Sequence, residues 1–214
     1  MRSKFDEQLA LLNRDLTKMG SLCEEALALA AKALANADGQ TAAKIAPIDS
    51  EIDQMERTIE SLCLKLLLQQ QPVARDLRQI SAALKMITDM ERIGDQASDI
   101  AEIIGFLNGR IGTDAQYICQ MAVAAMRMVT ESVEAYVKRD VAMAEATIQH
   151  DDVVDDLFLK VKESLIQMIS ENPKDGEYAL DLLMIAKYFE RIVDHATNIA
   201  EWVVFSVTGV HEQV

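Results

Sequence analysis

Apolar residues recur at steps of three and four positions along most of the chain, the spacing that places side chains on one face of an α-helix. The first such stripe runs from Phe5 to Ala33. Residues 36–39 end it with Asn-Ala-Asp-Gly, and Gly39 suits the left-handed conformation that often follows a helix. We therefore predict a first helix of roughly thirty residues.

Five further helices follow from the same spacing and from the breaks between them. Pro72 and the stretch 171–176 interrupt the apolar pattern, and Asn108-Gly109 stops it. Pro47 either kinks the second helix or marks its true start, because proline lacks a backbone donor. The sequence Thr-Asp-Ala-Gln at 113–116 has the form of a capping box and opens the fourth helix. We place these helices at about 41–71, 74–107, 113–138, 141–170 and 177–207.

A long segment of the chain occurs twice. Residues 90–102 read MERIGDQASDIAE, and residues 189–201, ninety-nine positions later, read FERIVDHATNIAE. The alignment extends back without gaps to Asp76 in the first copy and Asp175 in the second. Such self-similarity indicates a repeated structural unit.

A shorter segment precedes each long one, in the same order: DSEID at 49–53 and DDVVD at 151–155. The chain therefore predicts an all-α fold of two tandem, pseudo-symmetric three-helix bundles of long antiparallel helices, either stacked or side by side. We place the first repeat at 1–109 and the second at 113–214.

Composition and charge narrow the class of protein. Half the residues are hydrophobic, only 5% are aromatic, and there are 8 Gly and 3 Pro, which favours long helices. The net charge of −14 repels phosphate backbones and anionic lipids, so cations or basic protein surfaces are better partners than nucleic acid or membrane. The three scattered cysteines fit buried residues in a reducing cytosol. Without a secretion signal or a long apolar run, we expect a soluble, cytoplasmic protein.

The repeated segments carry polar residues, nearly all acids, at four-residue spacing, which places them on one helical face where like charges repel. The set comprises Asp49, Asp53, Glu91, Asp95 and Asp99 in the first half and Asp151, Asp155, Glu190, Asp194 and Asn198 in the second.

The turns between antiparallel helices relate these acids to one another. Residues at equal sequence distance from a turn lie at similar heights along the two helices. Asp53 and Glu91 each lie nineteen residues from Pro72, and Asp49 and Asp95 each lie twenty-three. In the second half, Asp155 and Glu190 lie at nearly equal sequence distances from Pro173, and so do Asp151 and Asp194. We predict that four carboxylates from two helices converge in each half.

Converging carboxylates without a nearby lysine are typical of a site for a hard cation. Oxygen ligands favour iron, manganese, magnesium or calcium over zinc. The alternative is an acidic stripe exposed to solvent, without metal. Asn198, where the first copy has Asp99, predicts a weaker or empty second site.

Other polar side chains have plainer interpretations. Arg92 and its counterpart Arg191 point about 100° away from the adjacent glutamates, which favours salt bridges to a neighbouring helix. The three histidines are interpreted as surface residues. Arg75 and Arg78, in VARDLRQI, form a local cationic spot and a weak candidate for binding an acidic partner.

On these residues the chain resembles the PhoU family, regulators of phosphate uptake in bacteria. The resemblance covers nearly the whole chain: each repeat has a D-x-x-x-D segment before an E-R-I-x-D-x-A-x-x-I-A-E-like segment, and PVARDLRQI precedes the first copy. It implies two three-helix bundles whose E/D-x-x-x-D motifs bind iron or other metal ions in some members. Carried onto this chain, those ligands are the ten residues given above.

The resemblance also implies a role without catalysis. It implies a regulator that connects the ATPase subunit of a phosphate ABC transporter to a sensor histidine kinase and holds the phosphate-starvation response off when phosphate is plentiful. We further expect a homodimer.

Two alternatives remain open. One is a metal-free helical scaffold. The other is a di-iron carboxylate enzyme, which is disfavoured because ferritin-like bundles use Glu-x-x-His. Here Gly94 follows Glu91 at that spacing, and Val193 follows Glu190.

Overall fold

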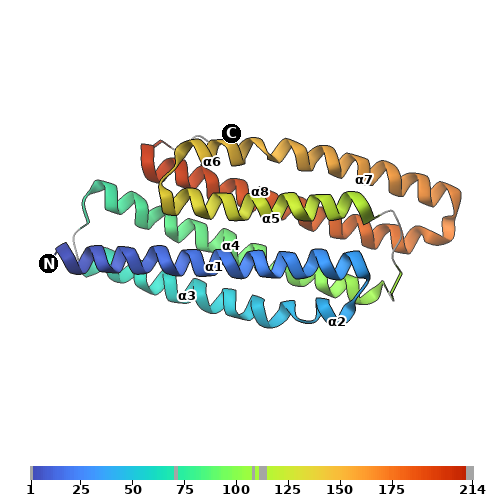
Figure 1. The fold of residues 1–214 in the computed structure, drawn as a ribbon, viewed down its shortest axis with the longest axis horizontal. Coiled ribbons are helices and arrows are strands. Elements are labelled where there is room, and N and C mark those ends of the chain that lie inside the picture. Colours follow the sequence, from blue (N-terminus) through green and yellow to red (C-terminus); the bar gives the residue numbers. More distant parts are fainter. Residues whose placement is uncertain (1, 70–71, 108, 111–114, 211–214) are drawn as a thin grey trace.

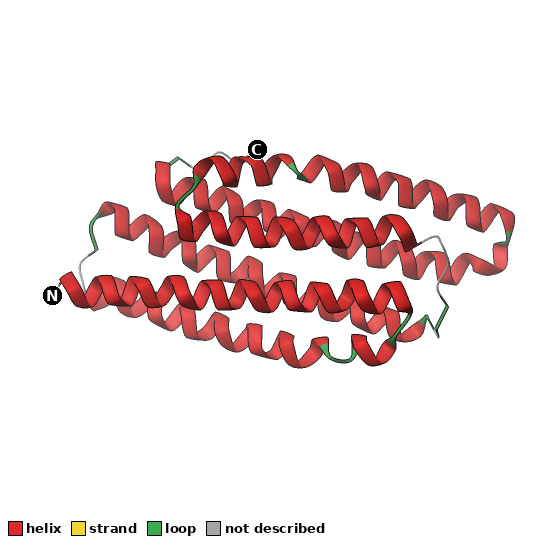
Figure 2. Ribbon diagram, in the orientation of Figure 1, coloured by secondary structure: helices red, strands yellow, loops and turns green. Residues whose placement is uncertain are grey.

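The computed structural model describes residues 2–69, 72–107, 109–110 and 115–210. Helices make up nearly all of these residues, which contain no strand (Figure 2). The predicted all-α class is therefore confirmed. None of the helices in these ranges is both long and apolar enough to cross a membrane.

The long helices match the apolar stripes closely. Both sequence repeats form three-helix units, in which a short helix precedes the middle one. The first unit consists of α1 (Arg2–Asn36), α2 (Gly39–Ala42), α3 (Ile45–Gln69) and α4 (Ala74–Phe106). The second consists of α5 (Gln116–Lys138), α6 (Val141–Gln149), α7 (Asp151–Glu171), the 3-10 turn Pro173–Asp175 and α8 (Gly176–Thr208).

The predicted second helix, 41–71, is two helices. Pro47 lies in the first turn of α3, where its missing N–H costs no hydrogen bond, so it marks a helix start rather than a kink. Gly39 is not the left-handed residue that we expected after the first helix. Ala37 takes that conformation, with φ of 41°, and Asp38 caps α2 by accepting a hydrogen bond from the Gln40 N–H at 2.9 Å.

The predicted fifth helix, 141–170, is also divided, at His150. Asp140 caps α6 by accepting from the Met143 N–H at 3.0 Å, so it performs for α6 the capping role that Asp38 performs for α2. The fourth helix begins at Gln116, and residues 113–114 of the expected capping box lie outside the described residues.

The two units lie side by side rather than stacked (Figure 1). The most extensive contact between them runs along α4 and α8, and α1 packs along α5. Gly20 makes the α1–α5 approach possible, because a Cβ there would lie only 3.0 Å from a Val133 methyl. The fold is therefore an elongated two-layer bundle.

A continuous apolar core fills the space between the layers. It includes Phe189 of α8, Leu16 of α1 and Ile118 of α5, all fully buried. Cys23 and Cys63 are also fully buried, as expected for small apolar residues, whereas Cys119, which we also expected to be buried, is partly exposed. Because α4 and α8 lie at the centre, they hold the repeated acidic motifs at fixed positions near the junction of the two units.

Candidate metal centre

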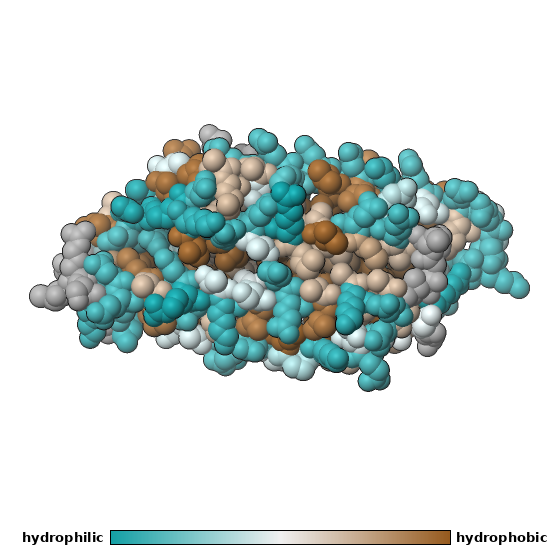
Figure 3. Space-filling view, in the orientation of Figure 1, coloured by the Kyte–Doolittle hydropathy of each residue, from teal (hydrophilic) through white to brown (hydrophobic). Residues whose placement is uncertain are grey.

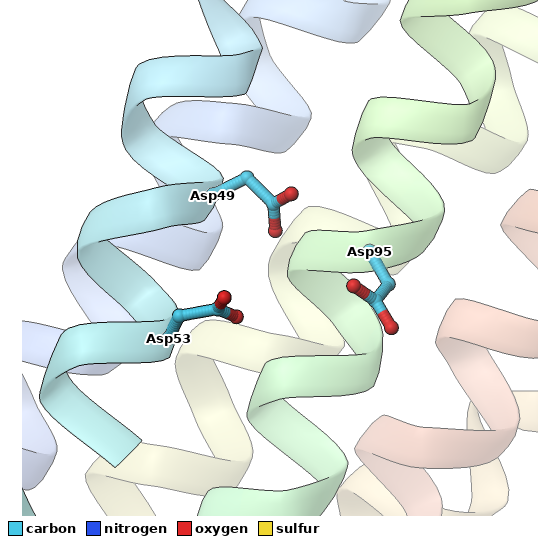
Figure 4. Close-up of side chains that lie close together, drawn as sticks. All are labelled: Asp49, Asp53 and Asp95. Carbon is cyan, nitrogen blue, oxygen red and sulfur yellow. The ribbon is translucent and has the colours of Figure 1, made fainter. Parts of the chain in front are cut away.

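Three carboxylates meet between α3 and α4 of the first unit. They belong to Asp49 and Asp53, one turn apart on α3, and to Asp95 on α4 (Figure 4). One oxygen from each side chain lies within 4.8 Å of the others, and all three residues are partly buried. Among the described residues, no other group of three acids, cysteines or histidines is as close.

Gly94 allows α3 and α4 to approach at this point. A Cβ at Gly94 would lie 2.7 Å from Oδ1 of Asp49 and 3.0 Å from Cδ1 of Ile52. Real Cβ atoms do not tolerate the first distance, so any larger residue would displace the Asp49 carboxylate. The absence of one side chain on α4 therefore shapes the cluster.

Of the two carboxylate oxygens of Asp49, one accepts a hydrogen bond and the other has no hydrogen-bond partner. Ser98 donates a hydrogen bond to Oδ2 at 2.9 Å, whereas Oδ1 is buried without a hydrogen-bond partner. Burial raises the pKa of Asp49, the Ser98 hydrogen bond lowers it, and the negative charges of Asp95 and Asp53 raise it further. A cation beside Oδ1 would satisfy this oxygen and relieve the repulsion.

The other two carboxylates have basic neighbours on their own helices. Arg92 Nη1 lies 3.1 Å from Oδ2 of Asp95, and Arg57 Nη2 lies 3.9 Å from Oδ2 of Asp53. The prediction that Arg92 bridges to a neighbouring helix is wrong, because its partners Glu91 and Asp95 are both on α4. Both arginines are more than half exposed, so their ion pairs are weak and replaceable.

Glu91 and Asp99, the remaining predicted ligands of the first half, lie outside the group of three. Glu91 is one turn before Asp95, with a pKa raised by burial and by the charge of Asp95. Asp99, one turn after Asp95, hydrogen-bonds to Tyr188 of α8 and so contacts the other unit.

The sequence analysis missed Glu56. This residue hydrogen-bonds to Thr88 on α4, and its charge raises the pKa of Glu91. Glu56 and Thr88 each lie sixteen residues from Pro72, so the height rule applied to the other acids would have paired them. The acidic surface of the first unit therefore extends one turn beyond the cluster.

The four acids of the second unit are close enough to affect one another but do not form an equally tight group. Burial raises the pKa of Asp151 to about 6, with further contributions from Asp155, Asp194 and Glu190. Asp155 and Asp194 are exposed. We predicted four converging carboxylates in each half; among the described residues, three meet in the first unit, and no equally tight group forms in the second.

A lysine occupies part of the second site. Lys187 forms an ion pair with Glu190, and its Nζ lies 5.5 Å from the centre of the Phe158 ring on α7. The expectation that lysine is absent near the acids is wrong here. The Lys187 ammonium already supplies positive charge next to Glu190, and it opposes the rise in the pKa of Asp194 that burial and the charge of Glu190 cause.

Asn198, the predicted weak ligand, points across the junction between units. Its Nδ2 donates to Oδ1 of Asp89 on α4 at 3.3 Å, and Nδ1 of His195 lies 2.8 Å from the same oxygen. Asp89 and Tyr188 are equivalent in the repeat, so the Asp89–Asn198 and Tyr188–Asp99 pairs are pseudo-symmetric. His195 is thus an interface residue with a side chain only 20% exposed, not a surface residue.

Arg75 and Arg78 lie in the first turns of α4, about 25 to 30 Å along the helix axis from Asp95. A cavity of about 1060 Å³ lies elsewhere, between α5 and α7, and is lined mainly by apolar side chains such as Val123, Val153 and Leu157. Figure 3 shows apolar side chains exposed over these helices. None of the predicted metal ligands lines that cavity.

A family model described as the PhoU domain matches the chain twice, at residues 16–104 and 118–203. The chain belongs to the PhoU family. Each match covers the three long helices of one unit, so the PhoU domain corresponds to the structural repeat.

Relatives and solved structures agree over nearly the full length. The chain is 36% identical over 210 residues to the phosphate-specific transport system accessory protein PhoU homolog of Clostridium acetobutylicum, covering 97% of this chain and 96% of that one. The crystal structure of PhoU from Pseudomonas aeruginosa, 33% identical, superposes with a TM-score of 0.92 over 96% of this chain and all of that one. The phosphate transport system regulatory protein PhoU from Streptococcus pneumoniae, 26% identical, gives 0.87 over 98% of this chain and all of that one.

The donor set of the first-unit cluster fits a hard divalent cation. All three candidate ligand atoms are carboxylate oxygens, and the Asp49 carboxylate has an oxygen that is buried without a hydrogen-bond partner. Three protein oxygens leave room for water in the coordination shell of magnesium, manganese or iron. The absence of histidine and cysteine from the cluster argues against zinc.

Proposed function

We propose that this protein is a non-enzymatic regulator of phosphate uptake that binds a metal ion at Asp49, Asp53 and Asp95. Its relatives are named phosphate-specific transport system accessory proteins, which supports a regulatory role in phosphate transport. In this role the protein connects the ATPase subunit of a phosphate ABC transporter to a sensor histidine kinase in the cytoplasm. It keeps the starvation response off while phosphate is plentiful.

The buried, unpartnered Oδ1 of Asp49 carries the metal part of the proposal. A solvated acidic stripe would leave every carboxylate oxygen in contact with water, whereas this oxygen is enclosed, and the carboxylate to which it belongs lies beside those of Asp53 and Asp95. Iron, manganese or magnesium would neutralise the cluster and bind α3 to α4. Glu91 and Glu56 would keep the surrounding surface acidic.

Metal binding is tested by elemental analysis of the chain purified without a histidine tag, followed by thermal unfolding of stripped protein with and without manganese or magnesium. We expect the ion to raise the Tm of the wild type. At a free metal concentration one hundred times Kd, the gain is about 2.7 kcal/mol.

Two matched variants test which unit is responsible for the metal-dependent rise in Tm. Asp95→Asn is expected to abolish the metal-dependent rise, whereas Asp194→Asn, the equivalent change in the second unit, keeps it. A rise that survives Asp95→Asn, or that is absent from the wild type, favours the metal-free scaffold instead.

The regulatory part needs a separate test in the cell. Deleting the gene is expected to switch on phosphate-starvation genes in phosphate-rich medium, and the wild-type gene restores repression. Normal repression in the deletion strain contradicts the regulatory role whatever the metal experiment gives.

A further inference from the structure

Three arginines gather where α4 begins, far from the carboxylate cluster. Arg75 and Arg78 are three residues apart on α4 and share a helical face. Arg139 ends α5 in the left-handed conformation, with φ of 57°, and its Nη1 donates a hydrogen bond to Oε1 of Gln79 at 3.2 Å. This bond brings the Arg139 guanidinium beside the two arginines of α4. We refer to Arg75, Arg78 and Arg139 as the arginine cluster.

A hydrogen-bond network fixes the position of Arg139. Gln79, which accepts from it, donates from Nε2 to Oδ1 of Asn13 on α1 at 3.3 Å. The hydroxyl of Tyr136, a buried residue of α5, donates to the backbone oxygen of Gln79 at 3.0 Å. The arginine cluster is therefore held by α1, α4 and α5 together, and its charge comes from both units of the fold.

The positive charge of the arginine cluster is poorly compensated. No ion pair among the described residues includes any of the three arginines, although the chain has 35 acids and 21 lysines and arginines. Nε of Arg78 is buried without a hydrogen-bond partner. Burial lowers the pKa of Arg139, as do Arg75 and Arg78, whereas Tyr136 of α5 and Asp76 of α4 act in the opposite direction.

The start of α4 adds to this charge. Its N-cap residue, Val73, makes no side-chain hydrogen bond to the backbone N–H groups of the first turn, which also contains Asp76. These groups and the helix dipole attract anions at a helix N-terminus. Guanidinium groups add forked donors that match the oxygens of phosphate.

We propose that the arginine cluster and the first turn of α4 bind free inorganic phosphate, without a metal ion. The site suits a small anion rather than a membrane, because the arginine cluster is a local positive spot on a chain of net charge −14: a small anion can contact the cluster alone, whereas an extended anionic lipid surface would also meet the surrounding acids. Binding requires no occupancy of the carboxylate cluster. Only its use in regulation rests on the function proposed above, for which it would provide a direct measure of phosphate.

Isothermal titration of the full-length, metal-stripped chain with sodium phosphate tests this proposal, with sodium chloride at matched ionic strength as the blank. We expect saturable binding of phosphate. Each lost charge-assisted contact is expected to weaken it about tenfold in Arg78→Gln and Arg139→Gln. Arg75→Gln is the variant least able to disturb the fold, because Arg75 is exposed and makes none of the hydrogen bonds of this network.

Lys162→Gln provides the matched control, since it removes one positive charge from the exposed face of α7. It should leave phosphate affinity unchanged, and circular dichroism should show every variant folded. Three results would overturn the proposal: no saturable binding to the wild type, equal weakening by Lys162→Gln, or binding that appears only after manganese is added. The last result would assign phosphate to the carboxylate cluster and leave the proposed function standing.

Vesicles distinguish a lipid headgroup from the free anion. Sedimentation with vesicles of phosphatidylglycerol is expected to leave the chain in the supernatant. Vesicle binding that Arg75→Gln removes, without binding of free phosphate, would make the arginine cluster a membrane contact and contradict the proposal.

Discussion

The two repeats place acids at matching positions, yet only the first forms a tight group of three carboxylates among the described residues. Two substitutions at equivalent positions accompany the difference. Gly94 of the first unit corresponds to Val193 of the second, and Thr88 corresponds to Lys187. The glycine admits Asp49 to the surface of α4, and the lysine places a positive charge beside Glu190. A repeated acidic motif is therefore insufficient for a tight carboxylate cluster, because the residues around it decide how closely the acids approach.

The outer surfaces of the two units also differ. Shifting the numbering by 102 aligns the buried positions of α1 with those of α5, and those of α3 with those of α7. In the first unit, the ion pair of Lys18 and Glu51, at 2.8 Å, bridges α1 and α3. Gln120 and Val153 stand at these positions in the second, where the α5–α7 cavity is open. The first unit thus combines the tight carboxylate cluster with an ion pair between α1 and α3, at positions where the second unit has a cavity.

The largest expected effect comes from removing the space at Gly94. Gly94→Ala would push the Asp49 carboxylate aside, so we expect loss of the metal-dependent stabilisation, about 2.7 kcal/mol at one hundred times Kd. Thermal unfolding with and without manganese measures it. Gly105→Ala, the same change on α4 where a Cβ meets no atom within 4 Å, is the control and should retain the full response. A full metal response in Gly94→Ala would show that the cluster does not depend on close approach of α3.

A smaller effect should follow from copying the lysine of the second unit into the first. Thr88→Lys places an ammonium near Glu56 and Glu91, which should weaken manganese affinity about tenfold, or 1.4 kcal/mol. Titration calorimetry measures the change. Thr88→Val removes the hydroxyl without adding charge and should have less effect. If the two variants weaken binding equally, the lost hydrogen bond and not the new charge is responsible.

The smallest expected effect is a pH dependence in the second unit. The folded-state pKa of Asp151, about 6, is above its ordinary value of 3.8, so the folded protein binds this proton before the unfolded chain does. Metal-free protein should therefore gain stability as pH falls from 7 to about 5, by about 1 kcal/mol after allowing for solvent screening of this partly exposed group. We therefore expect urea unfolding at pH 7 and at about pH 5 to show a smaller gain in stability for Asp151→Asn than for Asp152→Asn. Equal gains in the two variants would assign it to other acids, Asp49 among them.

The sequence predicted the helices better than the site. Periodicity placed α4 and α8 within a residue or two because long apolar stripes leave few alternatives. The same periodicity wrongly predicted α2 and α3 as one helix, and α6 and α7 as another. The short helices α2 and α6, capped by Asp38 and Asp140, continue the apolar stripes of the helices that follow them.

Equal distance from Pro72 correctly paired the heights of Asp49 and Asp95, but height does not give direction. Asp99 and Asn198 share a helical face with the other acids, yet they bond to Tyr188 and Asp89 across the junction of the units. That junction exists only after the two bundles pack side by side.

The sequence by itself determined the helical class, the internal repeat and which residues carry the repeated carboxylates, because these depend on local spacing and chemical type. Only the tertiary structure decided which acids meet, since oxygen-to-oxygen distances depend on how closely two helices pack. The space beside Gly94 and the gathering of Arg139 with Arg75 and Arg78 both arise from contacts between helices distant in sequence.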